Sequence, residues 1–217
     1  MASNTGHYEP IAREGYPFVV PCFAGAFLFW WWAWPWVSAL LLCGAAAIAA
    51  FFRNPERVSP EGDGIVVSPA DGTVMEILPD ATTPNLTHGE LQRVSIFMSL
   101  FNVHVNRSPL SGTVRQVVHI PGQFLDAREK ASSDLNERNS VVLDAAEGAI
   151  EVVQVAGLIA RRIACWVTPG DSLDRGQRFG LIRFGSRLDV YLPRHFVVDV
   201  HVGEKVRAGV SVIARFR

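Results

Sequence analysis

A serine, a histidine and an aspartate occupy three separate strand-like parts of this sequence. Asp71 precedes a glycine at a tight turn, His104 lies in an apolar segment among amides, and Ser186 directly follows Gly185. Side chains of these three types can activate a serine hydroxyl where they meet. The histidine accepts the hydroxyl proton, and the carboxylate fixes the tautomer of the histidine. The pattern is therefore compatible with a Ser-His-Asp site.

Each of these residues also has an ordinary structural explanation. An Asp-Gly pair is common in turns, a single histidine is often a hydrogen-bonded core residue, and a Gly-Ser pair often precedes a strand. A second group, with His119 in 119–122 and Arg138 in 136–139, could line a pocket or simply end a strand and cap a turn. The residues alone leave these alternatives open.

The elements that must position these side chains are short β-type runs separated by Gly, Pro, Asn and Asp. They are expected at 64–67, 72–77, 93–98, 112–118, 140–143, 149–155, 187–191 and 197–202. Short strands at such spacing predict a mainly β fold, a barrel or sandwich. The segment 127–136 is compatible with a helix or with a loop.

The C-terminal segment 202–210 places two glycines around an alternating strand. Together with the Asp71-Gly72-Thr73-Val74 turn, it resembles the hammerhead pattern of biotinyl- and lipoyl-type domains, which predicts a barrel/sandwich-hybrid-like domain. No lysine stands in the sequence context of a lipoyl carrier, which argues against that role.

A long hydrophobic segment precedes the β-type part. No residue from Tyr16 to Phe52 is charged, and the middle of this segment is rich in tryptophan around Pro35. Proline breaks helices and tryptophan favours membrane interfaces. We therefore expect a membrane anchor over 16–52, with two short helices at about 18–33 and 36–52 behind a tail of 1–15. A single tilted span stays open, whereas a cleaved signal peptide fits poorly.

Basic residues flank both ends of the hydrophobic segment, at Arg13, Arg53 and Arg57. The positive-inside rule then predicts the cell membrane, with the domain 53–217 on the cytoplasmic side. The formal net charge of −1 argues against a nucleic-acid binder. The three cysteines show no metal-binding spacing, so neither a metal site nor a disulfide framework is expected.

Six short motifs occur in an order that resembles the short prokaryotic branch of the phosphatidylserine decarboxylases. They are 51–57 (FFRNPER), 68–72 (SPADG), 102–107 (NVHVNR), 109–112 (PLSG), 136–138 (NER) and 184–186 (FGS). Longer members of the family carry Leu-Gly-Ser-Thr at the last motif, whereas this chain has Phe-Gly-Ser-Arg. The family's longer branch has two histidines close together where this chain has His104, which leaves His119 as a reserve candidate.

The resemblance implies an enzyme that cleaves itself between Gly185 and Ser186 and converts Ser186 into a covalent pyruvoyl cofactor. The products would be a β chain of 1–185 and an α chain of 186–217 that stay associated. The resemblance assigns His104, oriented by Asp71, as the proton acceptor. It further implies that phosphatidylserine forms a Schiff base on the pyruvoyl group and leaves as phosphatidylethanolamine and CO₂.

Some expectations depend on the sequence less directly. Arg107, Arg138, Arg187 and His119 are candidates for binding the substrate, and a homo-oligomer is possible. Two other functions are alternatives: a membrane-tethered binding or adaptor module built on a biotinyl-like barrel, and a Ser-His-Asp hydrolase. The sequence shows neither the long heptad repeats of such adaptors nor a Gly-x-Ser-x-Gly elbow.

Overall fold

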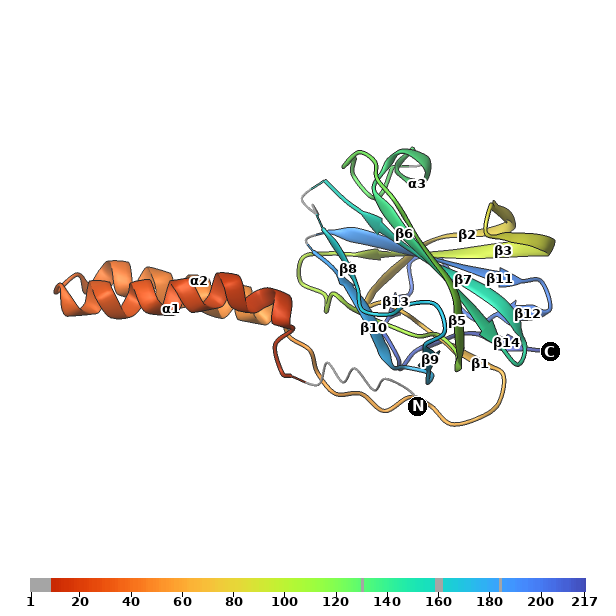
Figure 1. Cartoon of the computed structure of the whole chain (residues 1–217), viewed down its shortest axis with the longest axis horizontal. Helices are drawn as coiled ribbons and strands as arrows, with labels where there is room; N and C mark the ends of the chain where they lie inside the picture. Colours follow the sequence, from red (N-terminus) through yellow and green to blue (C-terminus); the bar gives the residue numbers. More distant parts are fainter. Residues whose placement is uncertain (1–8, 130, 159–161, 184) are drawn as a thin grey trace. The chain divides into compact units, whose positions relative to one another are not determined.

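The computed structural model describes residues 9–129, 131–158, 162–183 and 185–217, and these form two compact units. One unit comprises the helical residues up to Glu56, and the other comprises the β-rich residues from Arg57 to Arg217 (Figure 1). The boundary follows the change in the sequence from an uncharged apolar segment to short runs broken by turn residues.

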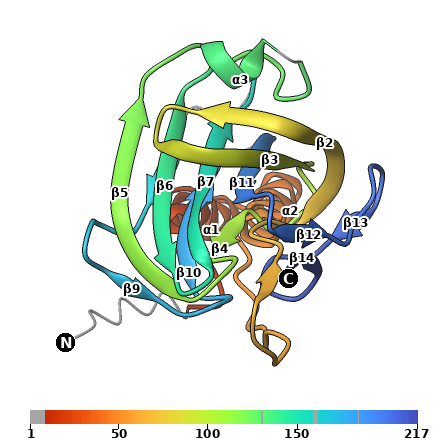
Figure 2. The same ribbon diagram turned by 90° about the vertical axis from the view of Figure 1, so that its right-hand side faces the viewer.

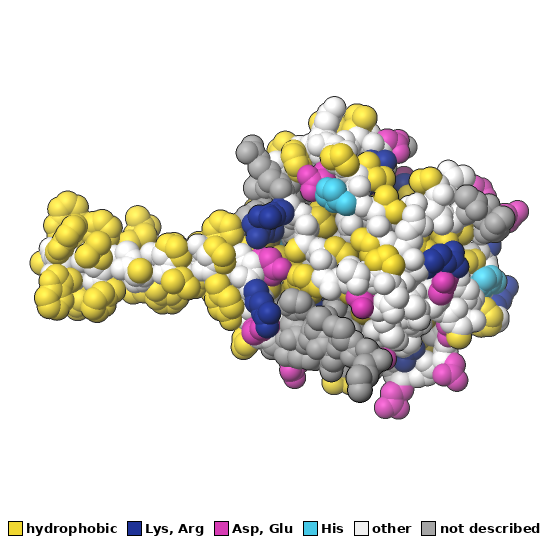
Figure 3. All heavy atoms as spheres, in the orientation of Figure 1, with side chains coloured by type: hydrophobic (Ala, Val, Ile, Leu, Met, Phe, Trp, Pro, Cys, Tyr) yellow, Lys and Arg dark blue, Asp and Glu magenta, His cyan; other side chains and the backbone are white. Residues whose placement is uncertain are grey.

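The helical unit is a pair of packed helices. A short 3₁₀ turn, η1 (Arg13–Gly15), leads into α1 (Tyr16–Trp31), and α2 (Pro35–Phe51) follows. Pro35 occupies the first position of α2, where its missing N–H costs nothing, and Ala33 takes a φ of 57° in the turn. Hydrophobic side chains cover the surface of both helices (Figure 3).

Within the described residues, neither of these helices nor any other combines the length and apolar character needed to cross a membrane.

The β-rich unit confirms the prediction of a mainly β fold. Its largest sheet is antiparallel, has the order β13-β2-β3-β11-β7-β6-β5-β9 and curls into a half-barrel (Figure 2). Its strands are β2 (Gly72–Thr83), β3 (Leu86–Met98), β5 (Gly112–Ile120), β6 (Arg138–Ala145), β7 (Gly148–Ala156), β9 (Ser172–Leu173), β11 (Ser186–Pro193) and β13 (Lys205–Val206). The biotinyl-like arrangement stays a prediction.

Two three-stranded sheets complete this unit. One has the order β1-β14-β12 and joins β1 (Ile65–Val67), β14 (Val212–Phe216) and β12 (Phe196–Val198). The other has the order β4-β10-β8 and joins β4 (Val105–Arg107), β10 (Arg178–Ile182) and β8 (Ile163–Cys165). Between β5 and β6, the segment left open as helix or loop contains one short helix, α3 (Ser132–Leu135).

Alternation along β11 separates the two faces of the large sheet. Leu188, Val190 and Leu192 point into the main hydrophobic core, while Tyr191 belongs to a smaller cluster on the other face. Successive side chains of a strand point to opposite faces, so Ser186 shares the core face with Leu188, and Arg187 lies on the opposite face. This register decides which residues can meet Ser186.

Candidate active site

Ser186 is the first residue of β11 and is fully buried in the middle of the large sheet. Its neighbours across the sheet are Met98 at the end of β3 and Ala156 at the end of β7. The Ser186 hydroxyl lies 3.7 Å from the sulfur of Met98. A serine held among apolar neighbours is shielded from bulk water, which suits a reaction within the chain better than hydrolysis by solvent.

Gly185 turns the chain into β11 with a φ of 60°. This left-handed conformation is readily available to glycine and uncommon for residues with a Cβ. The carbonyl group of Gly185 lies against Gly157, where an added Cβ would overlap the carbonyl oxygen. The two glycines therefore fix the position of the carbonyl that directly precedes Ser186.

His104 is fully buried just before β4. Its backbone carbonyl accepts a hydrogen bond from the N–H of Ile182 at 3.4 Å, at the end of β10. Its ring Nδ1 lies 3.0 Å from the carbonyl oxygen of Asn102. Because the chain passes from Ile182 through 183–185 into Ser186, this contact places His104 beside the segment that carries the Gly185–Ser186 bond.

Asp71 lies just before β2 and is almost fully buried. Its carboxylate forms a two-pronged ion pair with Arg57, in which one of the contacts is 2.8 Å, and it also accepts the Ala208 N–H at 2.8 Å. These partners fix the position of the Asp71 carboxylate. The predicted orientation of His104 by Asp71 stays a prediction.

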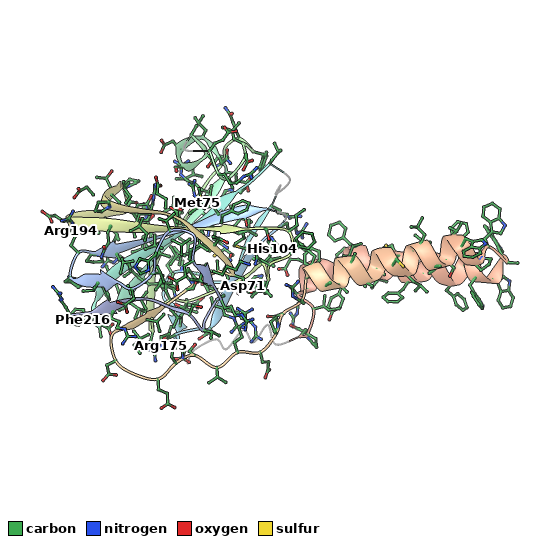
Figure 4. The ribbon with its side chains drawn as sticks, turned by 180° about the vertical axis from the view of Figure 1, so that it is seen from behind. Asp71, Met75, His104, Arg175, Arg194 and Phe216 are labelled. Atoms are coloured by element: carbon green, nitrogen blue, oxygen red, sulfur yellow. The ribbon has the colours of Figure 1, made fainter. Side chains whose placement is uncertain are left out.

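The chain segments that carry the three predicted catalytic residues lie around the end of β3. Thr73 of β2 pairs with Phe97, so Asp71 lies near the Met98 end of β3, where Ser186 begins β11. Asn106, two residues after His104, donates to the Met98 sulfur at 3.8 Å. Figure 4 shows Asp71 and His104 on the same side of the β-rich unit, away from Arg194 and Phe216.

A chain of buried amides also leads to this point. Asn139 on β6 donates to Gln154 on β7 at 3.0 Å, and Gln154 donates to Asn106 on β4 at 2.8 Å. Asn106 and Ser186 both contact the sulfur of Met98. The amide chain Asn139–Gln154–Asn106 thus joins three strands, β6, β7 and β4, beside the candidate nucleophile, and its side chains are buried.

The structure does not bring the predicted substrate-binding residues to the Ser186 face. Arg187 lies on the face opposite to Ser186, where it pairs with Asp189 and donates to the backbone carbonyl of Ala127. Arg138 lies on the same face as Arg187, because both residues pair with Val155 of β7. Arg107 is buried and donates to the carbonyl of Gly176 at 2.8 Å.

His119, the reserve candidate, lies on β5, and β6 and β7 separate that strand from β11. Its ring is about half exposed and lies 3.8 Å from the Glu137 carboxylate.

A cavity of about 380 Å³ reaches Gly185 from outside the domain. Phe97, Ala127, Arg128 and Leu158 are among the residues that line it. Arg128 forms an ion pair with Asp126, with a shortest contact of 2.6 Å, and its hydrogen bonds lower the pKa of the Asp126 carboxyl. The wall of this cavity carries both apolar and charged groups, and it reaches the candidate site at Gly185 from the Phe97 face of the sheet.

A family model described as phosphatidylserine decarboxylase matches residues 45–214 of this sequence. The chain belongs to the phosphatidylserine decarboxylase family. The match contains Asp71, His104 and Ser186, and it covers nearly the whole β-rich unit. Members of this family are lyases of phospholipid metabolism, so the buried serine and its surroundings belong to a decarboxylase.

In this phosphatidylserine decarboxylase family member, sequence reasoning missed Gly157, Gln154 and Met98 as parts of the site. Gln154 did carry a signal, because it is a polar residue within the apolar run 152–156, and such a residue needs a buried partner. Gly157 and Met98 carried none, since their importance comes from contacts with residues distant in the sequence.

Proposed function

We propose that this chain converts phosphatidylserine into phosphatidylethanolamine and CO₂ through a pyruvoyl group that it makes from Ser186. The observation that carries the proposal is the geometry at the Gly185–Ser186 bond. The serine is buried, the preceding glycine is left-handed, and the glycine carbonyl lies against Gly157. A backbone bent in this way suits attack by a side chain on the preceding carbonyl.

In the first step, Ser186 Oγ attacks the carbonyl carbon of Gly185. An ester replaces the amide, and His104 carries the hydroxyl proton towards the amine that is released. A base then removes the Cα proton of residue 186, and the Gly185 carboxylate leaves. The resulting enamine reacts with water, which yields a ketone at the new N-terminus and releases ammonia.

The surroundings of Ser186 fit a small, uncharged pyruvoyl group. Met98 and Ala156 flank the position on either side, and neither brings a charge to it. Once formed, the group would supply an electrophilic ketone for the substrate amine and an electron sink when CO₂ leaves. We assign to His104 the return of a proton to the substrate carbon, because its backbone is hydrogen-bonded to Ile182, four residues before Ser186.

The strand pairing supports the proposal that both fragments stay together after cleavage. The fragment 186–217 contains β11, which pairs with β3 on one side and β7 on the other. It also contains β13, paired with β2, and β14, paired with β1. A fragment held by these ladders and by the shared core does not separate under native conditions.

We also propose that the helical unit holds the enzyme at the cytoplasmic face of the cell membrane. Exposed tryptophans cluster around the turn between α1 and α2, with Trp31 and Trp36 among the most exposed. Indole rings favour the interface between water and lipid. The basic residues Arg13 and Arg53 lie at the other end of the pair, as expected for ends that stay in the cytoplasm.

Intact-mass spectrometry of the purified chain beside Ser186→Ala tests the self-processing. The wild type is expected to yield fragment 186–217, lighter by one ammonia than simple hydrolysis predicts, and the variant to stay uncut. A single full-length mass in both samples would remove the pyruvoyl mechanism. The processed sample is then assayed for release of CO₂ from phosphatidylserine labelled at the serine carboxylate.

A further inference from the structure

The cavity at Gly185 has a wall that combines one guanidinium group with exposed apolar side chains. The guanidinium is that of Arg128, whose centre lies 5.7 Å from the middle of the Phe97 ring. Phe97 is on β3 and pairs with Arg187, so Arg128 lies over the sheet face opposite to the Ser186 side chain, near the strand end where Gly185 leads into β11. A cation is thus placed in the wall of a cavity that reaches Gly185, the residue before the candidate nucleophile.

Arg128 is able to bind a further anion. Asp126 engages its Nε and Nη2 atoms, whereas a guanidinium carries five N–H donors arranged in a fork. The side chain of Arg128 is 66% exposed, and an ion pair so open to water stabilises little. A phosphodiester could therefore share the guanidinium with Asp126 or replace it at small cost.

The arginines that the sequence predicted to bind the substrate are engaged within the fold. Arg187 is buried and donates to the carbonyl of Ala127 and the hydroxyl of Ser132, while Arg107 is held on the carbonyl of Gly176. Arg187 therefore fastens the segment that carries Arg128, whereas Arg128 itself faces the cavity.

The rim of the cavity is apolar and open to solvent. Phe101 is 88% exposed and Leu158 is 65% exposed, and both line the cavity together with Leu100. Large apolar side chains grouped at such exposure around one opening indicate a surface that contacts another apolar phase. Phe101 and Leu158 come from different loops and meet at this opening, so the rim is a property of the fold.

We propose that this cavity receives the head group of an anionic diacyl phospholipid, with Arg128 on the phosphodiester and the Phe101–Leu158 rim against the bilayer. The inference rests on the proposed function and names the part of the site that selects the substrate. A lipid whose acyl chains stay in the membrane presents its phosphate at the interface. The cavity wall offers both a cation and exposed apolar side chains, the two kinds of group that such a lipid needs, and it reaches Gly185.

The role of Arg128 can be tested without any catalysis. Ligand-observed NMR with glycerophosphoserine, which has the head group and no acyl chains, is recorded on the uncut Ser186→Ala chain. Adding Arg128→Gln is expected to weaken binding roughly tenfold, the loss of one charge-assisted hydrogen-bonded contact. Arg215→Gln is the matched control, because Arg215 is 63% exposed and also pairs with an aspartate, Asp199.

The rim is tested by comparing two forms of the substrate. Phe101→Ser with Leu158→Ser is expected to raise the apparent KM for phosphatidylserine in vesicles roughly tenfold, since less apolar surface enters the bilayer. The KM for soluble dihexanoyl phosphatidylserine is expected to stay the same. Val202→Ser, at a residue that is 63% exposed, controls for loss of an exposed apolar side chain elsewhere.

The outcomes separate this inference from the proposed function. Equal binding by the Arg128 and Arg215 variants would overturn the phosphodiester contact, whether or not the enzyme decarboxylates lipid. Equal changes of KM for vesicles and soluble substrate would overturn the membrane contact of the rim. If the wild type releases no CO₂ while Arg128→Gln alone loses glycerophosphoserine, the head-group site stands and the proposed reaction falls.

Discussion

At the scale of single residues, the most informative contact is between two glycines. Gly157 lies directly against the carbonyl of Gly185, and an added Cβ at 157 would overlap that oxygen. Attack by Ser186 on this carbonyl requires the carbon and the hydroxyl oxygen to be aligned closely, and small misplacements are costly. The site therefore requires a glycine at position 157 as well as the hydroxyl group of Ser186.

We expect Gly157→Ala to slow self-cleavage about 100-fold, because it displaces the carbonyl of Gly185. The measurement is the fraction of uncut chain against time, followed by denaturing electrophoresis and intact mass. Gly44→Ala serves as the control, since an added Cβ at Gly44 meets nothing within 4 Å. Cleavage at the wild-type rate in a folded Gly157→Ala chain would show that the carbonyl position is unimportant.

At the scale of elements, the amide chain Asn139–Gln154–Asn106 ties the small sheet of β4 and β10 to the large sheet at β7. Gln154→Met keeps the side-chain volume but leaves two buried amides without this partner. The expected loss of unfolding free energy is about 1–3 kcal/mol, measured by urea denaturation in the Ser186→Ala background.

The coupling within the chain is tested by a double-mutant cycle with Asn106→Leu. The double variant is expected to lose less unfolding free energy than the sum of the losses of the single variants, because each single change removes the same hydrogen bond. Additive losses would mean that the two amides do not act as one connection.

The elements with clear alternation were predictable from sequence, and the site between them only in part. The run 93–98 lies within β3 and the run 187–191 within β11, since both alternate between core and opposite face. β10 and β4 were missed, because Arg178–Ile182 is buried at every position and Val105–Arg107 is very short. The motif predicts Ser186 as the candidate nucleophile. The arginines that share its face depend on the register of β11 with its neighbours, and no local sequence pattern predicts that register.

At the scale of the whole molecule, the order of strands predicts how the cleaved protein behaves. β11 begins at Ser186 and lies between β3 and β7, so the bond to be cut is at the N-terminal end of a strand that is paired on both sides. We expect fragments 1–185 and 186–217 to elute together in size-exclusion chromatography and to separate only in denaturant. Separation under native conditions would show that the ladders do not hold the fragment.

The position of β11 also determines when during folding the chain can be cut. A strand that is paired on both sides comes into place only when segments from 86–98 and 148–156 have already found it. The bond at its first residue acquires its bent geometry no earlier than that. Self-cleavage is then coupled to folding. A chain that has folded is cut and becomes active, whereas a chain that has not folded keeps its full length and can be detected by its mass. Uncut protein in a culture would thus measure folding yield, and variants far from the site that weaken the sheet would be detected as failures to mature.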